Sequence, residues 1–263
     1  MKKIVVCVAC AILSICNAAD KKAIIIGATS GMGKAVAIKL AKAGYIVGMA
    51  GRRKALLTEL KKQIPNSFIK RIDVTMPEAQ EKLKSLIEQM GGMDLMVISV
   101  SSNNDLNKSM TEAEIDKYVL DVDLRGFYTM ASAGFAYFEK QKAGHMVGIS
   151  SVDGIRGNAQ CPTYSGAKAF IDKYLEGKRN QYLQHKIPIT VTDIVPGWVD
   201  NEKCKYSKQS GTYWVASTDD AAKQIVEAIQ EKKKVAYITK RWAIISCLLQ
   251  IVPDRIYNAM GGF

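Results

Sequence analysis

The chain has 263 residues, of which 48% are hydrophobic and 24% are charged, the proportions of an ordinary globular protein with a large core. This length suits one α/β domain, or at most two small ones. The net charge of +12 admits anionic ligands, acidic membrane surfaces and nucleic acid as partners. The lysines, however, alternate with apolar residues along helical stretches such as "RRKALLTELKKQ", and no nucleic-acid motif is present. We therefore expect no nucleic-acid partner.

Residues 1–20 have the layout of a secretory signal peptide. Two lysines precede an apolar run from Ile4 to Cys16, and small residues follow before Asp20. The run is too short to span a bilayer by itself. A cleaved signal, an anchor and a start-site artefact, with translation beginning nearer Lys21, stay open as alternatives. We exclude this segment from the expected fold.

From Lys22 onward, short apolar runs alternate with segments of helical periodicity, a pattern typical of α/β proteins. The apolar runs predict strands at residues 23–27, 45–50, 68–74, 93–100, 144–150, 188–197 and 235–239. Helices are predicted at residues 33–44, 54–64, 77–90, over much of 112–141 and around Tyr164. The sequence therefore predicts a Rossmann-like, doubly wound parallel sheet with helices on both faces, formed by residues 21–240.

The first predicted strand leads into the glycine-rich stretch "GATSGMG". Glycines at a strand-to-helix turn let a phosphate approach the backbone, and the N-terminus of the helix faces that phosphate. The spacing is G-x-x-x-G-x-G rather than the commoner G-x-G-x-x-G. We predict that this turn binds a dinucleotide through Gly27, Thr29, Ser30, Gly31, Met32 and Gly33.

The end of the second predicted strand carries two arginines and no acid. An Asp or Glu about 20 residues past the glycines would bond the ribose hydroxyls of NAD. Here the sequence reads "AGRR", and the guanidinium groups of Arg52 and Arg53 suit a 2′-phosphate through charge-assisted hydrogen bonds. This position favours NADP(H). The alternative is a pair of solvated loop arginines.

The stretch "CPTYSGAKAF" places Tyr164 four residues before Lys168, so both side chains lie on one face of a helix. A nearby cation lowers the pKa of a tyrosine and suits it to proton transfer. A Y-x-x-x-K spacing also occurs by chance in many helices, where it serves only packing or solubility. The pair alone does not decide between these alternatives.

Several motifs together resemble those of the short-chain dehydrogenase/reductase family, in its single-domain form. They are "GATSGMG", "DV" at Asp73 and Val74, "GISS" ending at Ser151, "YSGAK" from Tyr164, and "PGWV" from Pro196. Ser151 lies 13 residues before Tyr164, the separation that the family uses. The resemblance extends from about Ala23 to Thr239.

The resemblance implies a role for each matching residue. Tyr164 would donate the proton, Ser151 would hold the substrate oxygen, and Lys168 would lower the pKa of Tyr164 and bond the nicotinamide ribose. The adenine would be flanked by Asp73 and Val74. The nicotinamide would be bordered by Pro196, Gly197 and Val199.

Two positions depart from the family pattern. Asp123 stands where the family commonly has an Asn in the long helix: if only its backbone carbonyl serves the proton relay, Asp can take that place, whereas if the side-chain amide orients the helix, activity should suffer. The usual Asn-Asn-Ala-Gly after the fourth strand is replaced by residues 98–101, so Ser99 is expected at a cofactor wall that differs from the usual one.

The expected function is that of an NADP(H)-dependent oxidoreductase moving hydride between the nicotinamide and a carbonyl or secondary alcohol. The alternative is a non-catalytic NADP(H)-binding sensor or scaffold. The resemblance also implies a homo-oligomer. Cys7 and Cys10 have C-x-x-C spacing without a second ligand pair, so we predict no metal site. The need for an intracellular cofactor argues against export and for a cytoplasmic protein.

Residues 241–263 form an unusually apolar tail. Lys240, Arg241 and Trp242 precede a run from Ala243 to Val252 in which few residues are polar. Basic residues and Trp beside a short apolar helix suit a helix lying in a membrane interface, which suggests a lipophilic substrate. Packing against a second subunit or against the protein's own core is the alternative.

Overall fold

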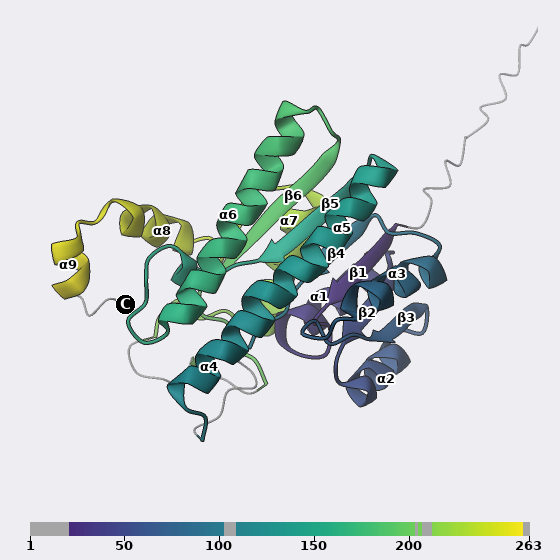
Figure 1. Ribbon diagram of the computed structural model, residues 1–263, viewed down its shortest axis with the longest axis horizontal. Helices are drawn as coiled ribbons and strands as arrows, with labels where there is room; N and C mark the ends of the chain where they lie inside the picture. Colours follow the sequence, from purple (N-terminus) through teal and green to yellow (C-terminus); the bar gives the residue numbers. More distant parts are fainter. Residues whose placement is uncertain (1–20, 103–108, 203–204, 207–211, 260–263) are drawn as a thin grey trace, which may run out of the picture.

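The computed structural model describes residues 21–102, 109–202, 205–206 and 212–259. The segment 1–20, which the sequence analysis treats as signal-like or anchor-like, lies outside the described residues. The described chain forms one sheet of seven parallel strands in the order β3-β2-β1-β4-β5-β6-β7 (Figure 1). Their bounds are β1 Lys22–Ile26, β2 Ile46–Gly51, β3 Ser67–Arg71, β4 Leu95–Ile98, β5 Gly144–Ile149, β6 Ile189–Pro196 and β7 Val235–Ile238. The predicted doubly wound parallel sheet is confirmed.

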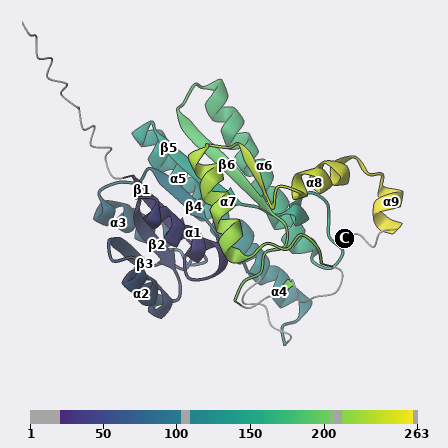
Figure 2. The same ribbon diagram turned by 180° about the vertical axis from the view of Figure 1, so that it is seen from behind.

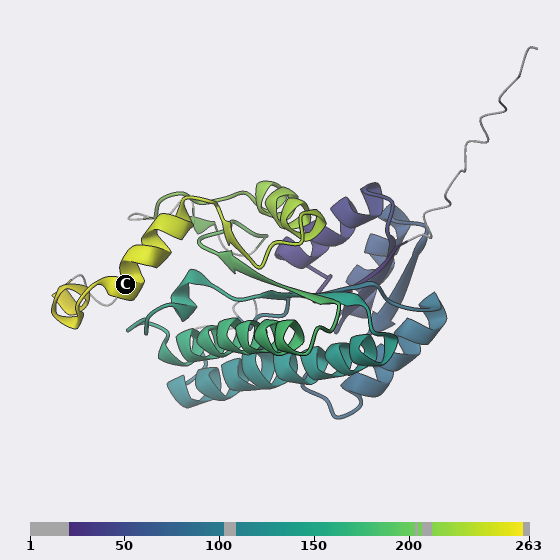
Figure 3. The same ribbon diagram turned by 90° about the horizontal axis from the view of Figure 1, so that it is seen from above.

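Helices cover both faces of the sheet, as Figure 3 shows from above. One face carries α1 (Gly31–Lys42), α2 (Lys54–Gln63) and α7 (Thr218–Gln230), seen in front in Figure 2. The other carries α3 (Ala79–Met90), α5 (Phe127–Gln141) and α6 (Pro162–Gln184). Side chains alternate along β1, so Ile25 packs into the first layer and Ile24 into the second. This explains why the strands read as continuous apolar runs.

Strand β1 lies between β2 and β4, and it pairs with both in parallel register. The chain moves outward from β1 to β2 and β3, then returns to the far side of β1 for β4. The order of strands therefore reverses between β1 and β4. Such a switch point opens a crevice at the carboxyl ends of the strands, where ligands bind in sheets of this type.

The long helix predicted within residues 112–141 is divided into three parts. It begins at α4 (Glu112–Val119), where Thr111 and Glu114 form a reciprocal capping box. A π-helical segment, η1 (Leu120–Gly126), then joins α4 to α5. This widened turn contains Asp123, whose side chain is fully buried. Segments of this kind are frequent at functional sites.

The helix α7 is absent from the sequence-based prediction, which assigned no element between residues 198 and 234. Its signals are nevertheless present, because Ser217 caps it by accepting a hydrogen bond from the Asp220 amide. Its buried face consists of Ala221, Ala222, Ile225, Val226, Ala228 and Ile229. This face packs on α1, so α7 completes the layer that carries the glycine-rich turn.

The tail projects from the side of the molecule as α8 (Trp242–Ile251) and α9 (Asp254–Ala259) (Figures 1 and 3). Its first residue, Trp242, is fully buried and has its ring centroid 5.5 Å from those of Trp198 and Tyr213. The first turn of the tail is thus part of the packed body. Within the described ranges, no helix is both long and apolar enough to cross a membrane.

Candidate active site

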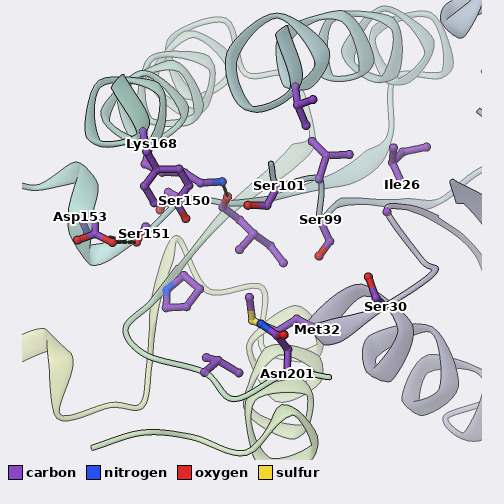
Figure 4. Close-up of a pocket in the computed structure, with 18 of the residues that line it drawn as sticks. Ile26, Ser30, Met32, Ser99, Ser101, Ser150, Ser151, Asp153, Lys168 and Asn201 are labelled. Atoms are coloured by element: carbon purple, nitrogen blue, oxygen red, sulfur yellow. Dashed lines mark hydrogen bonds between the residues drawn. The ribbon is translucent and has the colours of Figure 1, made fainter. Parts of the chain in front are cut away.

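A cleft of about 530 Å³ opens at the carboxyl ends of the strands, in the volume range of small-molecule sites. Segments from six strand ends line it, and Figure 4 shows some of their side chains turned toward one space. Of the predicted site residues, the cleft is lined by Gly27, Thr29, Ser30, Gly31, Met32, Arg52, Arg53, Asp73, Val74, Ser99, Ser151, Tyr164, Lys168, Pro196, Gly197 and Val199. Gly33 and Asp123 are not among the lining residues and lie behind them.

The glycine-rich turn forms one end of the cleft. Gly27 has φ of +89°, a backbone conformation that favours glycine. A Cβ on Gly33 would lie 2.4 Å from the carbonyl oxygen of Gly27, so this glycine lets α1 pack tightly against the turn. Gly33 therefore has a packing role, and its predicted contact with the cofactor stays a prediction.

The N-terminus of α1 already holds an anion. The Gly31 amide donates to a carboxylate oxygen of Glu202 at 3.0 Å. Backbone N–H groups and the positive end of the helix dipole favour negative charge at this position. A carboxylate therefore stands where the phosphate groups of a dinucleotide would lie, and a nicotinamide dinucleotide fits this end of the cleft.

Both arginines are held within the cleft rather than extended into solvent. The Arg53 guanidinium donates to the hydroxyls of Thr29 and Ser30, at 2.7 Å in each case. The Arg52 guanidinium donates to the Tyr118 hydroxyl at 2.6 Å. Two positive charges are thus oriented at the end of β2, which is the position expected for residues that bind a 2′-phosphate.

Ser151, Tyr164 and Lys168 meet at the opposite end of the cleft. Ser151 follows β5, while Tyr164 and Lys168 lie on the first turns of α6. The Lys168 ammonium nitrogen is 5.3 Å from the centroid of the Tyr164 ring. A hydrogen bond with Ser151 also acts on the Tyr164 phenol. The three residues that the sequence separates by up to 17 positions therefore form one cluster.

Asp123 reaches this cluster through Lys168. One of its carboxylate oxygens lies 3.1 Å from the Lys168 ammonium, and both side chains are almost completely buried. The other oxygen accepts a hydrogen bond from the Ser102 amide at 2.8 Å. An Asn could accept that second bond equally well, but only an Asp can neutralise the lysine. The carboxylate thus ties the loop after β4 to α6.

This pairing changes the expected effect of Lys168 on the tyrosine. Burial raises the pKa of Tyr164 well above its ordinary value, and the negative charges of Asp123 and Asp153 raise it further. The hydrogen bond between the Ser151 hydroxyl and the phenol acts in the opposite direction. The resemblance implied that Lys168 lowers this pKa, whereas burial of the phenol and the two carboxylates raise it. The phenol remains protonated at neutral pH, the form that can donate a proton.

Several other lining residues were not predicted from the sequence. They are polar or aromatic and lie outside the long helices and the strands: Asp153, Asn158, Gln160, Cys161, Asn201 and Tyr206. Asp153 could have been found, because it is two residues from Ser151. The others reach the cleft only through the course of their loops, which local sequence patterns do not specify.

The chain has relatives in sequence that cover most of its length. Residues 21–211 match the family described as short chain dehydrogenase. An uncharacterized oxidoreductase of Myxococcus xanthus (strain DK1622) is 27% identical over 244 residues, which cover 91% of this chain and 95% of that protein. An uncharacterized oxidoreductase of Staphylococcus aureus (strain USA300) is 31% identical over 186 residues, which cover 69% of this chain and 79% of that protein.

The chain belongs to the short-chain dehydrogenase/reductase family. It is an oxidoreductase of the kind that acts on CH–OH groups with a nicotinamide cofactor. Solved structures share the fold at lower identity. A variant of actinorhodin polyketide ketoreductase with NADPH has a TM-score of 0.70 at 19% identity, covering 83% of this chain and 95% of that one. ElxO with NADP bound has a TM-score of 0.70 at 21% identity, covering 83% of this chain and 97% of that one.

The Asp123 carboxylate predicts a specific pH response. Asp123→Asn keeps an acceptor for the Ser102 amide but removes a negative charge that raises the pKa of Tyr164. The pKa of the tyrosine should therefore fall, and the alkaline decline of carbonyl reduction should move to lower pH. The measurement is kcat/KM against pH for the variant and the unaltered protein.

The matched control is Asp121→Asn, a change of the same charge in the same π-helical segment, where Asp121 pairs with Lys117 and Arg125 near the surface. Its pH profile should coincide with that of the unaltered protein. An Asp123→Asn profile that is unchanged, or displaced to higher pH, would contradict the assigned effect of the carboxylate.

Proposed function

We propose that the protein is an NADP(H)-dependent reductase that converts a carbonyl compound to a secondary alcohol, or the reverse. One observation carries the proposal: the cleft that bears two oriented arginines at one end bears Ser151, Tyr164 and Lys168 at the other. The first end suits the 2′-phosphate of NADP(H). The second supplies the donors that a carbonyl oxygen needs as it gains negative charge.

When bound, the cofactor would supply a hydride to the carbonyl carbon. The Ser151 hydroxyl donates a hydrogen bond to the carbonyl oxygen of the substrate and holds that oxygen in position. The Tyr164 phenol transfers its proton to the same oxygen, so that the product is a neutral alcohol. The Tyr164 phenol is protonated at neutral pH, so the proton is present before the reaction begins. Lys168 would hold the nicotinamide ribose, and Asp123 keeps that ammonium group in place.

The remaining cofactor contacts belong to the same proposal. The glycine-rich turn would bind the pyrophosphate, and the Glu202 carboxylate would leave the Gly31 amide when it does. Asp73 and Val74 would flank the adenine. At the sheet edge, Ser99 and the segment from Pro196 to Val199 would border the nicotinamide half. No observation favours the non-catalytic alternative, which would bind NADP(H) without turnover. A homo-oligomer in the cytoplasm is the assembly and location we propose.

Tyr164→Phe tests the assignment of the acid. The variant lacks the transferable proton but keeps the ring, so turnover should fall by about 10²–10⁴-fold while the affinity for NADPH changes little. Turnover is followed through NADPH absorbance and binding through fluorescence titration. Tyr128→Phe, at a half-exposed tyrosine on α5, should retain full activity. A Tyr164→Phe variant that retains more than about a few per cent of turnover would contradict the role.

The cofactor preference is tested by titrating the protein with NADPH and with NADH. NADPH should bind at least ~10-fold more tightly, which corresponds to about 1.4 kcal/mol. Arg52→Ala and Arg53→Ala should each weaken NADPH binding more than NADH binding, because only NADPH carries the 2′-phosphate. NADH is the internal control, since a collapse of the loop at Thr29 and Ser30 would weaken both cofactors. Equal affinities in the unaltered protein would make these arginines structural.

We also propose that the tail contacts an anionic membrane surface. Ile244, Leu248 and Ile251 recur on one face of α8 and are 64%, 52% and 76% exposed. Lys240 and Arg241 precede this row, which suits a helix lying among anionic head groups. The Arg156 guanidinium binds the carbonyls of Leu249 and Val252, so the row is anchored close to the cleft. A lipophilic substrate taken from the membrane is consistent with this arrangement.

Vesicle flotation tests the membrane contact, with a chain that begins at Asp20 so that residues 1–19 play no part. The protein should float with vesicles that contain phosphatidylglycerol, and a variant with Leu248→Ser and Ile251→Ser should not. Leu183→Ser, which removes a leucine of similar exposure on α6, is the control and should float. Absence of flotation would contradict the membrane contact, and a dimer that the double variant dissociates would assign the row to a second subunit instead.

A further inference from the structure

Asp153 places an isolated negative charge at the substrate end of the cleft. It lies in the short helix η2 (Val152–Gly154), directly after Ser151, and it lines the cleft beside that residue (Figure 4). One carboxylate oxygen lies 3.3 Å from the Ser151 hydroxyl, which donates to it. The other accepts a hydrogen bond from the Asn158 side-chain amide at 3.0 Å.

This carboxylate has no cationic partner in the described part of the chain. The nearby Arg156 guanidinium is paired instead with Asp254, at 2.6 Å. The other carboxylate close to the cluster, Asp123, is neutralised by Lys168. Hydrogen bonds alone hold this half-buried carboxylate in the described part of the chain, so a cationic group on a ligand would meet a carboxylate that is not committed to another cation. Asp153 also raises the pKa values of Tyr164 and Cys161, so its charge acts inside the cleft.

A purely structural role does not require the carboxylate. The Asp153 backbone amide donates to the Ser151 hydroxyl, a contact that any residue could make. Asn158 is held independently, because its backbone amide donates to Ser165 and its side-chain oxygen accepts from the Gln160 amide. The local fold is therefore fixed without the Asp153 side chain.

The position of the carboxylate defines what it can contact. Consider a substrate whose reacting oxygen accepts a hydrogen bond from the Ser151 hydroxyl. A group on the carbon next to the reacting carbon then lies beside that hydroxyl, where Asp153 also lies. Ser151 now donates its proton to Asp153. A cationic donor on the substrate would replace Ser151 at the carboxylate and would free the serine proton for the substrate oxygen.

We propose that Asp153 determines substrate specificity by binding a protonated amine on the carbon next to the one that is oxidised or reduced. The substrates are then amino ketones and the corresponding amino alcohols. This inference rests on the proposed function of the same site. An ammonium group is favoured over a hydroxyl because the bond to a carboxylate is charge-assisted on both sides. A substrate carboxylate in that position is repelled.

Four alcohols that differ only in one substituent test the preference: isopropanolamine, propylene glycol, sec-butanol and lactate. The measurement is kcat/KM for NADP+ reduction with each. Isopropanolamine should exceed sec-butanol at least about tenfold, with propylene glycol between them and lactate lowest. Asp153→Asn should reduce the ratio of isopropanolamine to sec-butanol at least about tenfold, whatever its effect on the absolute rates.

Asp73→Asn is the matched control, because it removes a carboxylate from the other end of the same cleft, and it should leave that ratio unchanged. Equal kcat/KM for isopropanolamine and sec-butanol, or an unchanged ratio in Asp153→Asn, overturns the inference.

Calorimetric binding of the same compounds to the protein with NADP+ separates the two proposals. One outcome is that no compound is turned over, while the amine binds more tightly than the others and loses this advantage in Asp153→Asn. That outcome refutes the proposed function and supports the specificity. Absence of any preference for the amine in binding as well as in turnover refutes the specificity.

Discussion

The arrangement of the site depends on one geometric constraint, the parallel direction of all seven strands. Because the strands are parallel, their carboxyl ends meet at one edge of the sheet, and the reversal of strand order at β1 and β4 opens that edge into a cleft. Each strand from β1 to β6 delivers a lining residue at or directly after its end: Gly27, Arg52, Ile72, Ser99, Ser150 and Pro196. Residues far apart in the chain are therefore brought together without long connections.

Charge is distributed unevenly along this cleft. One end combines the N-terminus of α1 with two arginines, while the other holds a protonated tyrosine and the carboxylate of Asp153. The lysine between them is neutralised by Asp123. A phosphate-bearing cofactor and a cationic substrate would consequently be sorted to opposite ends by electrostatics before any specific contact forms.

Much of this structure could be predicted from the sequence because its signals are local. Apolar runs predicted all seven strands, and the glycine-rich turn follows β1 as expected. The spacing of Ser151, Tyr164 and Lys168 identified a cluster that the fold brings together. Helix α7 was missed although its cap and apolar face are local signals too. The sequence therefore contains the information needed to predict α7.

Other features could not be predicted because they arise from contacts between distant segments. The pairing of Asp123 with Lys168 joins positions 45 residues apart, and the burial of Tyr164, which raises its pKa most, also depends on the tertiary fold. The position of Glu202 at the N-terminus of α1 joins positions still further apart. Likewise, Trp242, at the start of the predicted tail, is buried against Trp198 and so belongs to the core. Local patterns carry no information about such partners.

The most direct test of the central claim, that one cleft binds NADP(H) and presents it to Tyr164, is a crystal structure of the protein with NADPH. We predict that the 2′-phosphate lies within hydrogen-bonding distance of the Arg52 and Arg53 guanidinium groups, and that the nicotinamide ring lies beside Tyr164 and Ser151. A 2′-phosphate that contacts neither arginine, or a nicotinamide ring outside this cluster, would contradict the claim.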